Sequence, residues 1–377
     1  MTQAREDSLE ALLGEAGLPP DADALPPAPP KRRRRGLRIA IVCLCVLMVL
    51  TGSGAVAGAM WFNKVTAQID KNLGRIGDPF ATISRAGRAP VDPSAEKALN
   101  VLLVGSDSRI SGGDPAQWVY GAQRTDTIML LHLAADRREA TIISIPRDSW
   151  VEIPGHGTAK INAAYSYGGP PLMIRTVEQL THVHIDHFAL LDFTGFVTIT
   201  NELGGVVIKV PKATHDTRAT FKAGTYRMNG ATALNYVRER HGLPNGDFDR
   251  VRRQQNWMRA VAKELIRRSK ISNPDTLTGP SRFLDPLNIL AKSVATDDGF
   301  TLGEMRGLAL SMQGSHTTDL IFMTAPVKRT GRSPDHTQSI VVLDLPKMNT
   351  LWKAVAADKV DPWLQKYKPQ LLPQTVN

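Results

Sequence analysis

The chain has 377 residues, 42% of them apolar, and a net charge of +10 at pH 7. This length is ample for a hydrophobic core. The only two cysteines, Cys43 and Cys45, lie two positions apart on different faces of a predicted helix, which excludes a disulfide framework and cysteine metal sites in the rest of the chain. Residues 1–38 hold seven Lys or Arg and six Asp or Glu, so the remainder carries +9 of the net charge.

The N-terminal region predicts a membrane anchor. A basic run at residues 31–35 and Arg38 precede residues 39–62, which are 24 residues without a charge. As a helix this stretch would be roughly 36 Å long, enough to cross a bilayer. The positive-inside rule places residues 1–38 in the cytoplasm, as a disordered basic tail, and the rest outside a single-pass cell membrane. Small residues near the end of the stretch leave a cleaved signal peptide as the alternative.

The basic surplus is therefore predicted to be extracytoplasmic. The polyanions found there are lipid headgroups and cell-wall polymers rather than chromosomal DNA. The charge of the chain consequently does not indicate nucleic-acid binding.

The outer region begins with a predicted stalk and continues as one folded domain. Residues 63–97 mix charge with Gly and Pro and show no sustained apolar period. From residue 98 onward the apolar pattern predicts strands at 99–105, 127–133, 140–145, 188–192, 206–210, 319–325 and 339–344, and helices at 173–180, 193–203, 231–236, 250–267, 301–312 and 346–357. This irregular alternation predicts one α/β (α+β) domain, residues 98–360, whose mixed central sheet is flanked by helices, before a C-terminal tail at 361–377.

Acidic and basic residues follow the predicted strand ends. Asp107 comes after the first strand, and Asp126 precedes the second. Two carboxylates at neighbouring strand ends suit a hard divalent cation, although either one alone could equally be a helix cap or turn residue. Arg147 and Lys160 lie after the third strand, where a structural salt bridge from Arg147 to Asp148 is the alternative to a ligand contact.

The densest charge lies between residues 236 and 255. Arg238 and Arg240 are two apart in a predicted extended stretch and would project to the same side. After a Pro/Asn/Gly turn, Arg250, Arg253 and Gln254 are spaced to share one face of a helix. Arginine stays charged at any workable pH and binds two oxygens at once, so the cluster predicts a site for a multiply charged anion. A solvated basic helix face is the alternative.

Six motifs resemble one known family. They are Gly-Ser-Asp-Ser-Arg from residue 105, Arg-Thr-Asp-Thr from 124, Pro-Arg-Asp from 146, Lys-Ile-Asn from 160, Val-Arg-Glu-Arg from 237 and Gly-Asp-Phe-Asp-Arg-Val-Arg-Arg-Gln-Gln from 246. Together they resemble the LytR-CpsA-Psr family of bacterial envelope enzymes. The resemblance covers about residues 99–265 and agrees with the membrane anchor, whereas the C-terminal hundred residues match more loosely.

The resemblance implies a phosphotransferase. Such an enzyme takes a glycopolymer linked through pyrophosphate to a polyprenyl lipid and joins it by a phosphodiester to a peptidoglycan sugar hydroxyl. By position, Asp107 and Asp126 correspond to the family's metal-binding acids, for Mg²⁺ or Mn²⁺. The pyrophosphate-binding positions correspond to Arg124, Arg147, Lys160, Arg238, Arg240, Arg250, Arg253 and Gln254. Arg147, Arg238 and Arg240 would carry catalysis with the two aspartates, and Asp247 would belong to the same site.

Two details of the chain bear on this implied site. Related sequences often carry glycine where this chain has Asp249, whose charge could pair with Arg252 or weaken phosphate binding nearby. The lipid would also need an apolar groove. Candidate lining residues, most of which would serve equally as core, are Leu172, Ile174, Leu190, Phe193, Phe196, Val197, Ile199 and Leu203.

Other functions stay open from the sequence. A noncatalytic wall-binding module would use the same arginines, but it would gain nothing from Asp107, Asp126 and Asp247. A pyrophosphatase would use every one of these residues, with water in place of the sugar. A transcriptional attenuator would need a DNA-reading element within residues 1–38, which are too short for a helix-turn-helix. The sequence identifies neither the general base nor the polymer, which could be teichoic acid, capsule or arabinogalactan.

Overall fold

The computed structural model describes residues 64, 67–84, 87–106, 125–271, 284–311 and 320–376, all within the unit Phe62–Asn377. The predicted cytoplasmic tail and transmembrane helix, residues 1–62, lie outside the described residues. Within the described ranges, no helix combines the length and the apolar character needed to span a bilayer.

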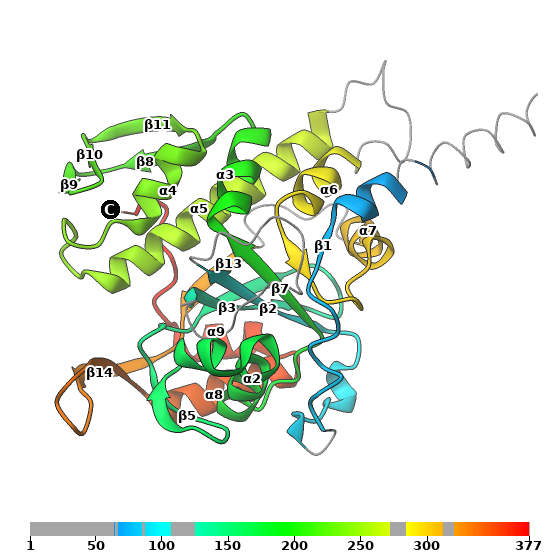
Figure 1. Cartoon of the computed structure of the whole chain (residues 1–377), viewed down its shortest axis with the longest axis vertical. Helices are drawn as coiled ribbons and strands as arrows, with labels where there is room; N and C mark the ends of the chain where they lie inside the picture. The colour runs from blue at the N-terminus through cyan, green and yellow to red at the C-terminus, as the bar shows by residue number, and fades with distance from the viewer. Residues whose placement is uncertain are drawn as a thin grey trace, which may run out of the picture. The chain divides into compact units, whose positions relative to one another are not determined.

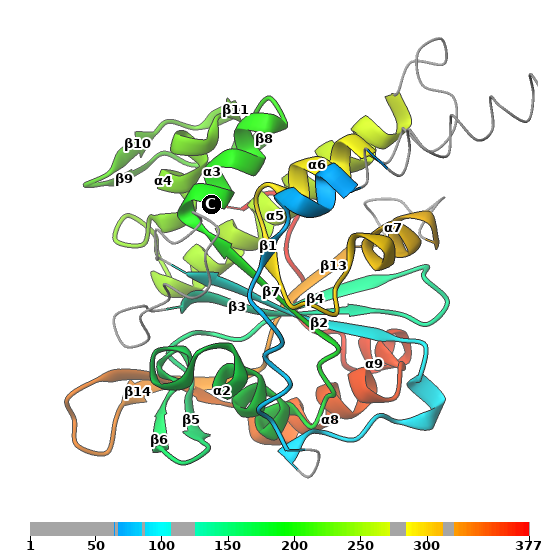
Figure 2. The same cartoon turned by 45° about the vertical axis from the view of Figure 1, so that its right-hand side comes forward.

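A seven-stranded mixed sheet forms the centre of this unit (Figures 1 and 2). In spatial order its strands are β1 (Gly74–Arg75), β12 (Ala295–Thr296), β7 (His187–Asp192), β2 (Leu99–Ser106), β3 (Thr125–Leu133), β4 (Ala140–Ser144) and β13 (Leu320–Thr324). The β2–β3 and β3–β4 pairs are antiparallel, whereas β2–β7 and β4–β13 are parallel. The predicted mixed sheet is thereby confirmed.

Alternate residues of the central strands enter two different cores, as the two-residue period of a strand requires. Leu102, Leu130 and Ile143 face the larger core, beneath the helices α2 (Ala163–Thr181), α8 (Leu345–Ala356) and α9 (Val360–Tyr367). Met129 and Ile142 point to the opposite face, which α5 (Asp247–Ile271) crosses. Both views show α2, α8 and α9 on one side of the sheet and α3, α5 and α6 on the other (Figures 1 and 2).

A second core lies among the helices on the α5 side. It joins α3 (Phe193–Glu202), α4 (Gly230–Arg238) and α5 to the hairpin of β8 (Val206–Val210) and β11 (Gly224–Met228). The Trp257 ring stacks on Phe196 at 4.0 Å between centroids, and its indole nitrogen donates to Thr200 Oγ1 at 3.1 Å. The remaining elements are β5 (Trp150–Ile153), β6 (Gly157–Lys160), β9 (Thr214–Asp216), β10 (Ala219–Phe221), α6 (Leu284–Ala291), α7 (Leu302–Ser311), β14 (Val327–Arg332) and β15 (Ser339–Leu343).

The segment expected to form a stalk is part of the folded body. β1 is an edge strand of the sheet, and Ile69 and Leu73 pack against Leu287, Ala291 and Leu302. Sequence periodicity did not reveal this because a two-residue strand is too short to show one. At the other end, the predicted tail begins within α9 and continues along β13, where the Leu372 amide donates to the Phe322 carbonyl at 2.8 Å.

Candidate active site

Sheet topology brings Asp126 and Arg147 together. Because β3 and β4 are antiparallel, the end of β4 lies beside the start of β3, and the Ile145 amide donates to the Ile128 carbonyl at 2.8 Å. Arg147 follows two residues later, and its Nη1 donates to Asp126 Oδ1. The prediction that charged residues gather at this edge of the sheet is met by this pair.

The first turn of α5 adds an aspartate and an arginine to the pair. Asp247 Oδ1 lies 2.9 Å from Arg250 Nη2 and 3.6 Å from Arg147 Nη2. Arg250 Nη1 lies 3.7 Å from Asp126 Oδ1. Two arginines and two aspartates thus alternate around one centre, which we call the anion cluster: Asp126, Arg147, Asp247 and Arg250.

Several polar atoms at this centre are buried without a hydrogen-bond partner among the described residues. They include Arg147 Nε, Arg250 Nε and Gln254 Oε1. Arg250 Nη2 and Asp247 Oδ1 form an ion pair at 2.9 Å, although their geometry is not that of a hydrogen bond. Arg250 is only 5% exposed. A buried polar atom without a partner costs about 1–3 kcal/mol, and more when it is charged. Such atoms persist where a ligand completes them, so the arginine donors indicate a bound anion.

Burial and neighbouring charges shift the pKa values of Arg147 and Arg250 in opposite directions. Burial lowers the pKa of Arg250, and the charge of Arg147 lowers it further, against the attraction of Asp247. Burial also lowers the pKa of Arg147, but the carboxylates of Asp247, Asp126 and Asp148 outweigh it and leave that pKa raised. An incoming phosphate would relieve the unfavourable burial of Arg250.

Arg238 and Arg240 approach from α4. Arg238 ends that helix, and its guanidinium carbon lies 4.5 Å from the centroid of the Phe193 ring. Arg240 is exposed, and its charge contributes to lowering the pKa of Arg250. Within the described ranges neither guanidinium has a carboxylate partner, so both remain available to an anion.

The structure does not bring Arg253 into the anion cluster. Its side chain is fully buried: Nη1 donates to Glu239 Oε2, and Nη2 donates to Thr214 Oγ1 at 3.1 Å. Consecutive helical residues point about 100° apart, so Arg250 and Gln254 face the site while Arg253 turns away. Glu239 stands between Arg238 and Arg240, so the buried pair fixes the backbone that carries both. The sequence signal for this pairing is the acidic residue between two arginines.

Lys160 and Asp249 each form an ion pair with a nearby residue. Lys160 Nζ lies 3.1 Å from Asp148 Oδ1, and Asp148 lies 3.9 Å from Arg147 Nε. Lys160 therefore joins the site through Asp148. The predicted pairing of Asp249 with Arg252 is confirmed at 3.1 Å, and Asp249 also accepts from the Asn245 amide.

The predicted metal site is described only in part. Asp107 and Arg124 lie outside the described residues, and Asp126 already contacts Arg147. No group of three or more His, Cys, Asp or Glu side chains that could hold a metal occurs in the described part of the chain. Of the two predicted metal-binding acids, the described part contains Asp126, so a hard cation bound there would need Asp107 and phosphate oxygens as further ligands.

An apolar cavity of about 300 Å³ opens beside the anion cluster, between the sheet and the helices α3, α4 and α5. Asp126, Arg238, Arg250 and Gln254 contribute to its lining. Its apolar lining includes Leu103, Met129, Leu191, Phe193, Phe196, Ile199, Leu234, Trp257, Met258, Val261 and Leu265.

The cavity separates the groove candidates into two sets. Phe193, Phe196 and Ile199 line it. Leu172, Ile174 and Leu190 lie in the larger core, Leu203 lies in the second core, and Val197 packs against that second core. Three of the eight candidates therefore face the site. The residues from α4 and α5 were missed because a cavity wall and a core face have the same apolar spacing in sequence.

Known proteins match most of this chain in sequence. The model of the LytR_cpsA_psr family matches residues 63–357. The chain is 29% identical over 352 residues to the cell wall biosynthesis protein LcpA of Corynebacterium glutamicum, covering 83% of this chain and 64% of LcpA. It is 35% identical over 255 residues to the probable cell wall biosynthesis protein LcpB of the same organism, covering 63% of this chain and 58% of LcpB. The matches thus span less than two thirds of either relative.

Solved structures share the fold. Bacillus subtilis TagV matches with a TM-score of 0.57 and 24% identity, over 70% of this chain and 98% of TagV. A structure of TagT bound to LI-WTA matches with a TM-score of 0.54 and 22% identity, over 72% of this chain and 95% of TagT. With the family model matching most of its length, the chain belongs to the LytR_cpsA_psr family.

Proposed function

We propose that this chain is a membrane-anchored, extracytoplasmic phosphotransferase of the bacterial cell wall. Its donor is a glycopolymer carried on a polyprenyl pyrophosphate, and its acceptor is a sugar hydroxyl of peptidoglycan. The product is a phosphodiester between the two polymers, and the lipid leaves as its monophosphate.

One observation carries the proposal. The Nε donors of Arg147 and Arg250 are buried without a hydrogen-bond partner among the described residues, and Arg250 also lines an apolar cavity. A polyanion alone would have no use for the cavity, and a hydrocarbon alone would leave the donors unpaired. A lipid pyrophosphate satisfies both, and each methylene that enters the cavity contributes about 0.8 kcal/mol to binding.

The arginines and aspartates of the site have different roles in the proposed transfer. Arg147, which follows β4, and Arg250, on α5, bind the pyrophosphate oxygens, while Arg238 at the end of α4 and Arg240 just after it supply further positive charge. The acceptor oxygen attacks the phosphorus on the glycan side, and the bond from that phosphorus to the bridging oxygen breaks. Positioned cations stabilise the charge that develops on these oxygens. A Mg²⁺ or Mn²⁺ ion held by Asp126 and Asp107 would add to that neutralisation.

The relatives support a glycopolymer as the donor. LcpA and LcpB carry the name of cell wall biosynthesis proteins, and TagT is known bound to LI-WTA. Because this chain spans only 64% of LcpA, its substrates and partners remain part of the proposal.

Transfer can be measured directly with the full chain, purified in mild detergent. It is incubated with a lipid pyrophosphate-linked glycan and insoluble peptidoglycan, with and without Mg²⁺, and glycan that sediments with the peptidoglycan is counted. Attached glycan and released lipid monophosphate are expected together. Lipid monophosphate without attachment would identify a pyrophosphatase, and neither product would leave a noncatalytic binding module.

A further inference from the structure

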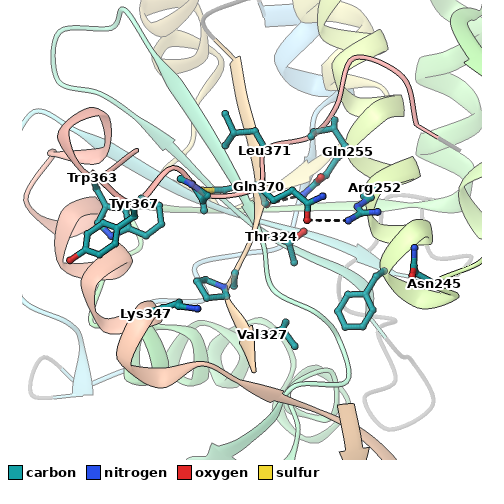
Figure 3. Close-up of a pocket in the computed structure, with 16 residues that line it drawn as sticks. Asn245, Arg252, Gln255, Thr324, Val327, Lys347, Trp363, Tyr367, Gln370 and Leu371 are labelled. Carbon is teal, nitrogen blue, oxygen red and sulfur yellow. Dashed lines mark hydrogen bonds between the residues drawn. The ribbon is translucent and has the colours of Figure 1, made fainter. Parts of the chain in front are cut away.

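A second cavity, of about 630 Å³, lies on the other side of α5 from the anion cluster. We call it the C-terminal pocket, because α9 and the segment after it form much of its wall. Its polar and aromatic lining consists of Asn245, Phe248, Arg252, Gln255, Thr324, Lys347, Trp363, Tyr367 and Gln370. Figure 3 shows Trp363 and Tyr367 side by side on one side of the pocket, with Arg252 and Asn245 across from them.

Trp363 and Tyr367 form the aromatic side of this pocket. The Trp363 and Tyr367 rings lie 5.2 Å apart, and the Trp363 indole nitrogen donates to Thr350 Oγ1 at 3.0 Å. Trp363 is almost fully buried, whereas Tyr367 is 44% exposed, unusually open for a large aromatic residue. Lys366 Nζ lies 5.2 Å from the centroid of the Tyr367 ring and covers part of it. The part of the ring that stays exposed can receive an apolar face of a ligand.

The other lining groups favour a ligand that forms hydrogen bonds without carrying a high charge. Arg252 is paired with Asp249 at 3.1 Å, and Lys347 is paired with Asp344 at 3.2 Å. Both cations thus have a carboxylate partner already, which distinguishes this pocket from the anion cluster. Gln370 Oε1 accepts from Arg252 Nη2 at 3.4 Å, and Asn245 Nδ2 donates to Asp249 at 3.2 Å. Gln370 Nε2 therefore serves as a donor to a ligand, and Asn245 Oδ1 as an acceptor. A pyranose ring has the matching chemistry, with C–H groups on its faces and hydroxyl or acetamido groups around its edge.

The pocket is close enough to the anion cluster for one polymer to reach both. The first turn of α5 is their common wall: Asp247 faces the anion cluster, while Asn245 and Phe248 line the pocket. Gln255 fixes this wall to the sheet, because its Nε2 donates to Ser144 Oγ and to the Met323 carbonyl, both at 2.8 Å. Arg147 follows Ser144 by three residues.

We propose that the C-terminal pocket binds a sugar unit of the acceptor glycan strand, a few units away from the hydroxyl that reacts. This inference rests on the proposed transferase function, but its first test does not. The pocket holds the strand by stacking on Tyr367 and by hydrogen bonds from the facing amides. The strand then passes over the start of α5 toward the pyrophosphate.

Binding is measured by titration calorimetry on the full chain with a β-1,4-linked N-acetylglucosamine tetrasaccharide as the probe. Tyr367→Ala is expected to raise the Kd by about tenfold, the effect of losing one aromatic contact, and Tyr367→Phe is expected to retain binding. The matched control is Tyr167→Ala, which removes an equally open tyrosine stacked on His156 elsewhere on the surface. An unchanged Kd in Tyr367→Ala, or an equal loss in Tyr167→Ala, overturns the proposal.

Transfer kinetics separate this inference from the proposed function. Tyr367→Ala is expected to raise the KM for soluble glycan strands and to leave the KM for the lipid-linked donor unchanged. If transfer proceeds with an unaltered KM, the pocket assignment fails and the transferase stands. If the wild-type protein transfers no glycan but Tyr367→Ala still weakens tetrasaccharide binding, the proposed transferase function is wrong and the assignment of a sugar-binding pocket is retained.

Discussion

Four charged side chains, two arginines and two aspartates, determine what the anion cluster can bind. Arg147 and Arg250 are held by Asp126 and Asp247 at distances that fix their direction but leave donor atoms unused. A planar guanidinium offers fixed forks of donors, which lysine does not. The cluster is therefore preorganised for phosphate oxygens before the substrate arrives.

Removing one of these arginines should abolish most of the activity. Arg250→Ala and Arg238→Ala are each expected to lower the transfer rate by roughly 10³ or more, as the loss of an arginine finger does elsewhere. Arg250→Lys is expected to restore little, because an ammonium group lacks the rigid planar pair of donors with which a guanidinium binds two oxygens at once. Arg267→Ala is the control, since Arg267 lies on the same helix, is half exposed and pairs with Glu264. A variant of Arg250 or Arg238 that keeps half of the wild-type rate would contradict the assignment.

Arg253 makes a separate prediction about stability. Arg253→Met leaves the Glu239 carboxylate buried without its partner, which is expected to lower the free energy of unfolding by about 3–5 kcal/mol. The double variant Arg253→Met/Glu239→Met removes both charges and is expected to regain most of that loss. Urea unfolding of the two single variants and the double variant completes the cycle. Additive losses would show that the two side chains do not act as a pair.

Metal dependence follows from Asp126. Chelation with EDTA is expected to reduce transfer, and added Mg²⁺ or Mn²⁺ should restore it. Asp126→Asn should shift the metal concentration needed for half-maximal rate upward, because a neutral amide is a weaker ligand for a hard cation. Transfer that is indifferent to chelation would leave Asp126 with the sole role of orienting Arg147.

The helices α3 and α5 keep the apolar cavity open over the sheet. Ala262 lines this cavity, whereas the next residue, Lys263, is exposed. Ala262→Phe is expected to raise the KM for a long-chain prenyl pyrophosphate donor by about tenfold, since a few methylenes at about 0.8 kcal/mol each lose their place. A donor with a single isoprene unit should be affected little, and Lys263→Phe should behave as wild type. An equal effect on both donors would mean that the cavity does not hold the chain.

Sequence patterns predicted the long elements and missed the short ones. The apolar run 99–105 becomes β2, and the Thr301–Glu304 spacing becomes the capping box of α7, with the Thr301 amide donating to Glu304 Oε2 at 2.9 Å. β1 and β12 have two residues each and depend on partners far away in the chain, which no local pattern encodes. The position of Arg253 outside the anion cluster could not be predicted either. Sequence spacing gives the angle between two side chains on a helix, but it does not say which of them faces the ligand.

The whole unit arranges its parts in layers that suit a lipid-linked substrate. One face of the sheet is closed by α2, α8 and α9, and the cavity lies on the other face beneath α3 and α5 (Figures 1 and 2). The anion cluster stands at the mouth of that cavity, and the C-terminal pocket lies beyond the first turn of α5. The places that we propose for lipid, pyrophosphate and acceptor thus lie around a single helix. The predicted anchor at residues 39–62 would hold these places near the membrane that carries the donor.

The position of a phosphorus label tests the central claim most directly. The donor is prepared with ³²P only at the phosphorus on the glycan side and incubated with the full chain and peptidoglycan. The label is expected to enter a phosphodiester on the peptidoglycan, and the released lipid monophosphate is expected to be unlabelled. Label that stays with the lipid, or that is released in soluble form with no attachment to peptidoglycan, would contradict this claim.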